Sequence, residues 1–129
     1  MRIFVTILAA MALSGVAAAQ DEDLSPAEIA SVLTQVAANY SLPQSLDPTT
    51  TLVDVRAIGL ILNFHYTLNE HGSAANLRAF FVRNRVSMIC GDENVEWLFG
   101  QGVTFRYTYT ILDESEPVVI DVNDAVCAH

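Results

Sequence analysis

The sequence predicts an α+β fold, with a four-stranded, mainly antiparallel sheet and helices packed on one face, in the order α-β-β-α-α-β-β. Three observations support this prediction. Residues 60–68 and 103–111 alternate apolar and polar side chains, as half-buried strands do. Residues 25–40 and 73–89 repeat apolar side chains at helical spacing. No internal linker, repeat or low-complexity tract divides the chain, which indicates a single domain.

The N-terminal segment, residues 1–19, has the features of an export signal and is left out of the predicted fold. Arg2 supplies a positive charge, and the apolar stretch behind it is too short to span a bilayer. Small residues precede the expected cleavage site, which lies between Ala19 and Gln20. No second long apolar run follows. We therefore expect residues 20–129 to form one soluble domain, periplasmic or secreted, that does not insert into a membrane.

The predicted mature chain is strongly acidic. It holds all fifteen Asp and Glu residues but only five of the six basic residues, all of them arginine, so its formal net charge is −10 with neutral histidines. Such a chain repels phosphate backbones and anionic lipids, which argues against nucleic acids and membrane surfaces as partners. Solubility is the simplest role for this charge.

The two cysteines, Cys90 and Cys127, are predicted to form a disulfide, because exported chains meet an oxidising environment and only one intramolecular pairing exists. The bond would close a loop of about 38 residues and would thereby reduce the entropy of the unfolded chain. A pair of reactive thiols is the alternative. The chain has no CxxC motif and no cysteine at a helix N-terminus beside a base, which disfavours that alternative.

The first predicted helix begins with a capping box. Ser25 and Glu28 flank Pro26, which suits the first helical turn. The helix ends before Pro43, which cannot continue it. Residues 41–51 form a connector with turns, because they include two prolines.

The strands are predicted from alternation and turn residues. Residues 52–58 alternate weakly, and Gly59 permits a tight turn into the strand at 60–68. The clearest strand is 103–111, and Pro117 begins the last one. The expected inner face of the first strand contains Val53, Val55 and Ala57.

The second predicted helix, 73–89, has an apolar arc wide enough to bury two of its faces. Its three arginines, Arg78, Arg83 and Arg85, most simply pair with carboxylates in so acidic a chain. A short third helix follows, and Asp92 is its predicted N-cap.

Candidate catalytic and metal-binding residues are few. His65, Glu70 and His71 are the only cluster that resembles metal ligands, and no HExxH motif or paired CxxC accompanies them. They are more simply surface residues. The chain also lacks a GxSxG elbow and a phosphate-binding loop. We therefore predict no catalytic residue, metal or cofactor, and keep a metal-dependent hydrolase only as a remote alternative.

The leading functional hypothesis is an exported, non-catalytic module that binds a protein partner or a second copy of itself. The wide apolar arc of the second helix motivates it. The candidate interaction surface comprises Phe80, Phe81, Val82, Arg83, Arg85 and Val86. The alternative is a small-ligand binder whose groove is lined by the aromatic strand residues Tyr66, Tyr107 and Tyr109.

Several segments together resemble a group of small exported proteins of Gram-negative bacteria, most of them uncharacterised. They are the LP…D..T.L segment from Leu42 to Leu52, the aromatic Phe64-His65-Tyr66, the YxY strand that ends at Tyr109, and the two distant cysteines. The resemblance covers most of the predicted mature chain. It implies an α+β fold and a disulfide, and it transfers no catalytic residue.

Overall fold

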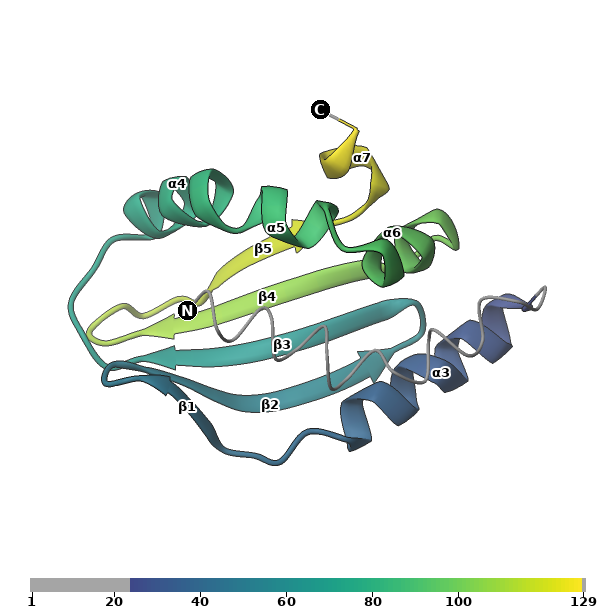
Figure 1. Cartoon of the computed structure of the whole chain (residues 1–129). Helices are drawn as coiled ribbons and strands as arrows, with labels where there is room; N and C mark the ends of the chain where they lie inside the picture. The colour runs from purple at the N-terminus through teal and green to yellow at the C-terminus, as the bar shows by residue number, and fades with distance from the viewer. Residues whose placement is uncertain (1–23, 129) are drawn as a thin grey trace.

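A five-stranded sheet organises residues 24–128, which the computed structural model describes (Figure 1). The predicted leader lies outside the described residues. The strands lie side by side in chain order, as β1 (Gln44–Asp47), β2 (Thr50–Ile58), β3 (Ile61–Leu68), β4 (Thr104–Ile111) and β5 (Val118–Val122).

The sheet is mixed, because β3 and β4 pair in parallel while the other neighbours are antiparallel. The prediction of a mainly antiparallel sheet is confirmed, since three of the four strand pairs are antiparallel, but the predicted number of four strands is wrong. The connector contributes β1, an edge strand of four residues, which is too short to show an alternation. The β2–β3 hairpin and the β4–β5 hairpin meet in parallel, because the helices between them carry the chain back across the sheet.

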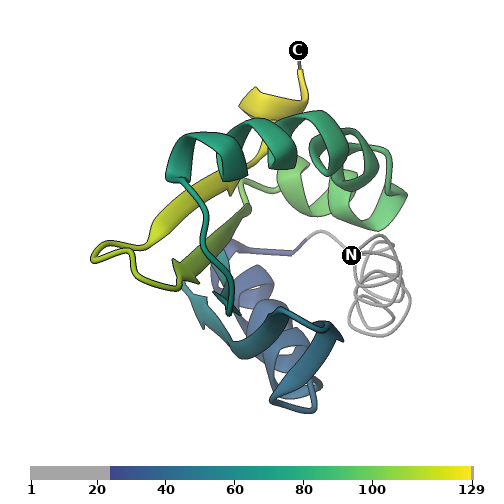
Figure 2. The same ribbon diagram turned by 90° about the vertical axis from the view of Figure 1, so that its left-hand side faces the viewer.

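Two groups of helices cover the inner face of the sheet, on one side of it (Figure 2). In chain order the helices are α3 (Pro26–Ala38), α4 (Ala74–Asn84), α5 (Val86–Cys90), α6 (Glu93–Gly100) and the short α7 (Asp124–Cys127). α3 packs on β2 and β3, whereas α4 contacts β5. Rings on both sides reach the same sheet face, because Tyr40 contacts Phe64 and Phe99 contacts Phe105. Within residues 24–128 no helix has the length and apolarity needed to cross a membrane.

The predicted capping box of the first helix is confirmed. The Ser25 hydroxyl accepts a hydrogen bond from the backbone N–H of Glu28 at 3.2 Å, and the Glu28 carboxylate accepts one from the N–H of Ser25 at 3.0 Å. The predicted Asp92 cap of α6 is also present, since its carboxylate accepts from the N–H groups of Asn94 and Val95. These local signals act over three residues and could therefore be recognised in the sequence.

The predicted helix over residues 73–89 is interrupted at Arg85. This residue ends α4 and precedes α5, with φ −115° and ψ −38°. Its N–H still donates to the Phe81 carbonyl at 2.8 Å, and its own carbonyl accepts from Ile89 at 3.0 Å. The interruption is therefore a local distortion between two helical segments, and Arg85 is buried at that point.

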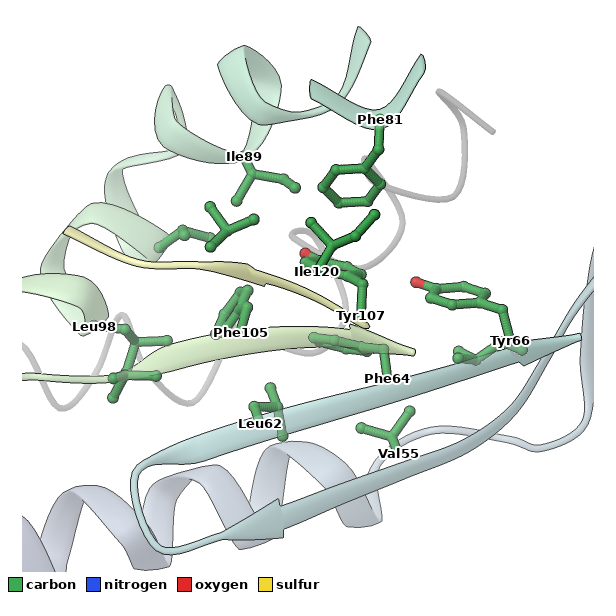
Figure 3. Close-up of a cluster of buried hydrophobic side chains, with 14 of the residues drawn as sticks. Val55, Leu62, Phe64, Tyr66, Phe81, Ile89, Leu98, Phe105, Tyr107 and Ile120 are labelled. Carbon is green, nitrogen blue, oxygen red and sulfur yellow. The ribbon is translucent and has the colours of Figure 1, made fainter. Parts of the chain in front are cut away.

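The parallel register of β3 and β4 places aromatic rings opposite one another at the centre of the core (Figure 3). Phe64 and Tyr107 are 5.1 Å apart between ring centroids, and Tyr66 and Tyr109 are 4.7 Å apart. Phe81 of α4 contacts Tyr107 at 4.9 Å. Each of these five side chains is at most 2% exposed. The inner faces predicted for these two strands are therefore the faces that form the core.

A bulge in β2 changes which of its side chains face inward. Leu52 pairs with Tyr66 and Asp54 pairs with His65, so Val53 is an extra residue in the ladder. Leu52 and Val55 are buried, whereas Val53 is 36% exposed. The prediction that placed Val53 on the inner face is therefore wrong, because one inserted residue reverses the alternation that precedes it.

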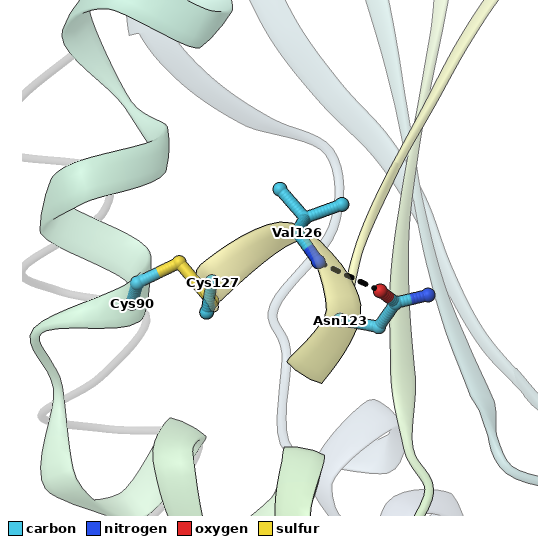
Figure 4. Close-up of a disulfide and its surroundings, with 4 residues drawn as sticks. All are labelled: Cys90, Asn123, Val126 and Cys127. Carbon is cyan, nitrogen blue, oxygen red and sulfur yellow. Dashed lines mark hydrogen bonds between the residues drawn. A yellow bond between two sulfur atoms is a disulfide. The ribbon is translucent and has the colours of Figure 1, made fainter. Parts of the chain in front are cut away.

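The predicted disulfide between Cys90 and Cys127 is present, with 5.5 Å between the Cα atoms (Figure 4). Cys90 is the last residue of α5, and Cys127 is the last residue of α7. The side chain of Asn123 caps α7 by accepting a hydrogen bond from the N–H of Val126 at 3.3 Å. The bond therefore joins the helices of the crossover to the segment that follows the edge strand β5.

Removal of this disulfide should destabilise the protein substantially. We expect the Cys90→Ser/Cys127→Ser variant to lose about 4 kcal/mol of unfolding free energy, because its unfolded chain regains the entropy of the closed loop. Urea denaturation of the variant, and of the wild type with and without reductant, measures this loss. Reduced protein that unfolds at the same urea concentration as oxidised protein would show that the bond has no structural role.

Candidate functional site

A pocket of about 350 Å³ opens at the end of the sheet that the last residues of β3 and β4 reach. Its walls come from the β1–β2 turn, the loop after β3, the first half of α4 and the end of β4. The polar residues Asp47, Glu70 and His71 line part of it. Its apolar lining consists of Leu68, Leu77, Phe80 and Ile111.

Backbone hydrogen bonds hold the walls of the pocket together. The N–H of Asn69 donates to the Thr49 carbonyl at 2.7 Å, which ties the loop after β3 to the β1–β2 turn. The N–H of Leu112 donates to the Leu68 carbonyl at 3.0 Å, which ties the ends of β3 and β4 together. The pocket is therefore assembled from segments that are distant in the sequence, so no local sequence motif predicts it.

Asp47 shapes the turn at one side of the pocket. One of its carboxylate oxygens accepts hydrogen bonds from the N–H groups of Thr49 and Thr50, at 3.0 and 2.8 Å, and from the Thr49 hydroxyl at 3.2 Å. Desolvation opposes its charge, but these hydrogen bonds outweigh desolvation and lower the pKa of the Asp47 carboxyl. Asp47 is therefore a negatively charged member of the lining.

The three candidate metal ligands do not converge. Nε2 of His65 lies 2.9 Å from the Thr110 hydroxyl, on the outer face of the sheet. Nδ1 of His71 lies 2.9 Å from the Asp113 carboxylate, and both of these side chains are exposed. Glu70 and His71 line the pocket, but His65 does not. Within residues 24–128 no group of three His, Cys, Asp or Glu side chains could hold a metal ion.

The six residues of the predicted interaction surface are divided between two environments. Phe81 and Arg85 are buried, and Val86 is partly buried. Phe80, Val82 and Arg83 are exposed, with 39% exposure for Phe80 and 60% for Val82. Phe80 also lines the pocket. The exposed side of α4 therefore continues into the pocket through Phe80.

Within residues 24–128, Arg78, Arg83 and Arg85 form no ion pair with a carboxylate, contrary to prediction. Arg78 donates to the Val119 carbonyl of the edge strand β5 at 2.8 Å. Arg85 places its guanidinium carbon 5.3 Å from the centroid of the Phe80 ring. Among the described residues, Arg56 pairs with Asp54 and Arg106 pairs with Asp121. Arginines 78 and 85 are held by a carbonyl and a ring, which charge composition alone cannot predict.

Arg85 is unusual because it is largely buried and has no carboxylate partner within residues 24–128. The residue is 7% exposed, and its buried Nε has no hydrogen-bond partner. A desolvated cation–π contact contributes about 2 kcal/mol. Only Nε of the Arg85 guanidinium is a buried atom without a partner, so the cost of its burial is smaller than that of a fully buried ion, and the contact with Phe80 offsets part of this cost.

The three tyrosines of the predicted ligand groove are members of the core. Tyr66, Tyr107 and Tyr109 are at most 2% exposed, and none of them lines the pocket described above. Burial raises the pKa of each phenol well above its ordinary value, and it does the same for Tyr40. These four are all the tyrosines of the chain.

Comparison with known proteins identifies similar folds. No protein-family model matches the sequence, and no curated protein matches it. A solved structure of a Pseudomonas aeruginosa protein, provisionally described as secreted, superposes with a TM-score of 0.66 and 18% identity. That alignment covers 82% of this chain and 98% of the other.

The second similar structure is EpsS, the pilotin of the Vibrio vulnificus type 2 secretion system. Its TM-score is 0.59 at 14% identity, and the alignment covers 79% of this chain and 90% of EpsS. At such low identities the similarity concerns the fold. The resemblance to small exported proteins of Gram-negative bacteria stays a prediction.

The tyrosines provide a direct test of the closed core. The unfolded chain loses phenolic protons near pH 10, whereas the folded state retains them because its pKa values are higher. The contribution of the tyrosines to the free energy of unfolding is therefore fully present below about pH 10, and it is lost as the pH rises towards their pKa values in the folded state. We expect the tyrosinate absorbance to appear only together with loss of the circular-dichroism signal.

The same chain unfolded in urea is the control for this titration, and it should ionise gradually around pH 10. A folded protein in which two or three tyrosines ionise at that pH would instead have an open, solvent-filled groove beside them.

Proposed function

We propose that this protein is an exported, non-catalytic module that binds a protein partner through the exposed side of α4 and the adjoining pocket. The observation that carries the proposal is Phe80, a half-exposed aromatic residue at the boundary between the two. Aromatic side chains beside a concave apolar surface are typical anchors of protein–protein interfaces. Leu77, Leu68 and Ile111 supply the apolar wall that such an anchor requires.

Export is supported by the disulfide and by the sequence of residues 1–19. A structural disulfide persists in oxidising compartments and is rare in reducing ones. The periplasm or the extracellular medium would provide this environment.

The similarity to EpsS favours one particular form of the proposal. EpsS is a pilotin of a type 2 secretion system. An exported, non-catalytic module of this fold would suit an accessory role beside a larger export assembly, although the fold alone does not fix the function. A second copy of the chain is the other partner that we consider, and it would produce a homodimer.

A small-ligand binder is the second candidate function. The pocket volume of about 350 Å³ lies within the range of small-molecule sites. This candidate differs from the sequence-based hypothesis in its location, because the pocket lies beside Phe80 and not beside the tyrosine rings. The remote alternative of a metal-dependent hydrolase has no comparable support, because His65 and His71 bind separate partners.

The export step can be tested on the intact protein. Expression of the full chain in a Gram-negative host should yield a periplasmic or secreted product whose N-terminus is Gln20, because small residues precede that position. Intact-mass spectrometry of the fractions measures this. A full-length product that stays in the cytoplasm would contradict the export proposal.

The interaction itself can be tested by photo-crosslinking. A photoreactive phenylalanine analogue at position 80 should form an adduct with a partner protein in the exported compartment. The same analogue at position 119 is the matched control, because Val119 has a similar exposure of 38% but lies on the outer face of the sheet. Mass spectrometry identifies the adduct, and an adduct with the chain itself would indicate a homodimer.

Binding of the purified partner then measures the contribution of the anchor. Phe80→Ser should weaken binding about tenfold or more, which corresponds to about 1.4 kcal/mol. Val119→Ser should leave the affinity unchanged. Equal adducts at positions 80 and 119, or no adduct at position 80, would overturn the proposed interaction site.

A further inference from the structure

Arg85 does not line the pocket itself, but its guanidinium contacts a residue that does. Its guanidinium carbon is 5.3 Å from the centre of the Phe80 ring, and the same ring lines the pocket. The Nε atom is buried without a hydrogen-bond partner. One aromatic side chain therefore contacts both an unpaired cation and an open apolar space.

Electrostatics connects the two sides of this region as well. The pKa of Tyr109 is raised mainly by burial, but the charge of Arg85 lowers it and the charge of Asp47 raises it. Both charges therefore act on one phenol, although they come from the α4–α5 junction and from β1. Asp47 also lines the pocket.

We propose that Arg85 is an anchor for a carboxylate of the partner, and that an apolar group next to this carboxylate occupies the pocket against Phe80 and Leu77. This inference rests on the proposed function, and it specifies the chemistry of the partner. A guanidinium presents parallel N–H donors that match the two oxygens of a carboxylate. Binding would supply the counterion that the folded chain does not provide.

A singly charged carboxylate fits this site better than a phosphate. The lining includes the carboxylates of Asp47 and Glu70, and the whole chain is acidic. A doubly charged group would meet stronger repulsion from these charges, whereas one arginine balances one carboxylate. The recognised feature is therefore an acidic side chain or a chain terminus beside an apolar side chain.

A purely structural role for Arg85 makes a different prediction. If the arginine stabilised the fold, then its replacement by methionine, which keeps most of the apolar stem, would destabilise the protein. If the arginine is kept for binding, then Arg85→Met removes an uncompensated buried charge, and the melting temperature stays the same or rises. The stability of this variant separates the two roles without any ligand.

The binding test uses 3-phenylpropionate, which combines a carboxylate with an apolar ring, and 3-phenylpropanamide as its uncharged control. In a spectrum of the arginine Nε–H groups, the Arg85 signal is identified by its loss in Arg85→Met. It should shift on addition of the acid, with a dissociation constant of about 1 mM, and should not shift with the amide. Arg56→Met is the matched control, because Arg56 is an exposed arginine of β2 that lies outside the proposed binding surface.

The expected outcome is that Arg85→Met binds the acid at least tenfold more weakly and is no less stable than the wild type, while Arg56→Met binds it normally. An unmoved Arg85 signal, equal binding of acid and amide, or a clear loss of stability in Arg85→Met would overturn the proposal. Two further probes separate the sources of the carboxylate. N-acetylphenylalanine represents a chain terminus, and N-acetyl-glutamyl-phenylalaninamide represents an acidic side chain.

Failure of this inference can be distinguished from failure of the proposed function. If position 80 crosslinks to a partner protein but Arg85 does not respond to carboxylates, then the interaction stands and the anchor is wrong. If Arg85 binds the acid but position 80 forms no adduct, then the site is a small-ligand site and the interaction proposal is wrong.

Discussion

The parallel pairing of β3 with β4 is the constraint on which the rest of the structure depends. It sets the rings of Phe64 and Tyr66 against those of Tyr107 and Tyr109, and these rings form the centre of the core. A tight turn cannot join two parallel strands, so the chain must cross the sheet, and α4, α5 and α6 form that crossover. The disulfide then ties the middle of the crossover, at Cys90, to the chain after β5.

The same pairing produces the candidate site. The C-terminal ends of parallel strands lie at the same end of the sheet, so the segments that follow β3 and β4 meet there. Together with the β1–β2 turn they enclose the pocket. The crossover begins from this edge, which places Phe80 of α4 beside the pocket. The distortion between α4 and α5 then buries Arg85 against that ring. A largely buried arginine thus contacts a residue that lines the pocket.

The comparison with solved structures separates the fold from the site. The two similar chains share the arrangement of strands and helices with this protein at identities of 18% and 14%. Identities this low leave the side chains around the pocket free to differ, so a function cannot be transferred from the fold alone. The specific chemistry proposed for this chain therefore rests on its own residues, above all on a buried arginine in a strongly acidic protein.

The sequence by itself determined the features that depend on neighbouring residues, and the disulfide, for which only one pairing of cysteines exists. The capping box at Ser25, the alternation in β3 and β4, and the disulfide between the only two cysteines are of this kind. Only the tertiary structure decided the parallel pairing, because it depends on contacts such as that between His65 and Thr110, 45 residues apart. The edge strand β1 is too short to show an alternation, and the bulge at Val53 appears only in how β2 pairs with β3.

The candidate site divides in the same way. The sequence pointed to the helix segment that contains Phe80 and Arg85, because its apolar arc is unusually wide. It could not show that Phe80 stays half exposed beside a pocket while Arg85 is buried without a carboxylate. Helical periodicity defines the angles between the side chains around the helix axis. The packing of the helix on the sheet then decides which of these side chains are exposed to solvent.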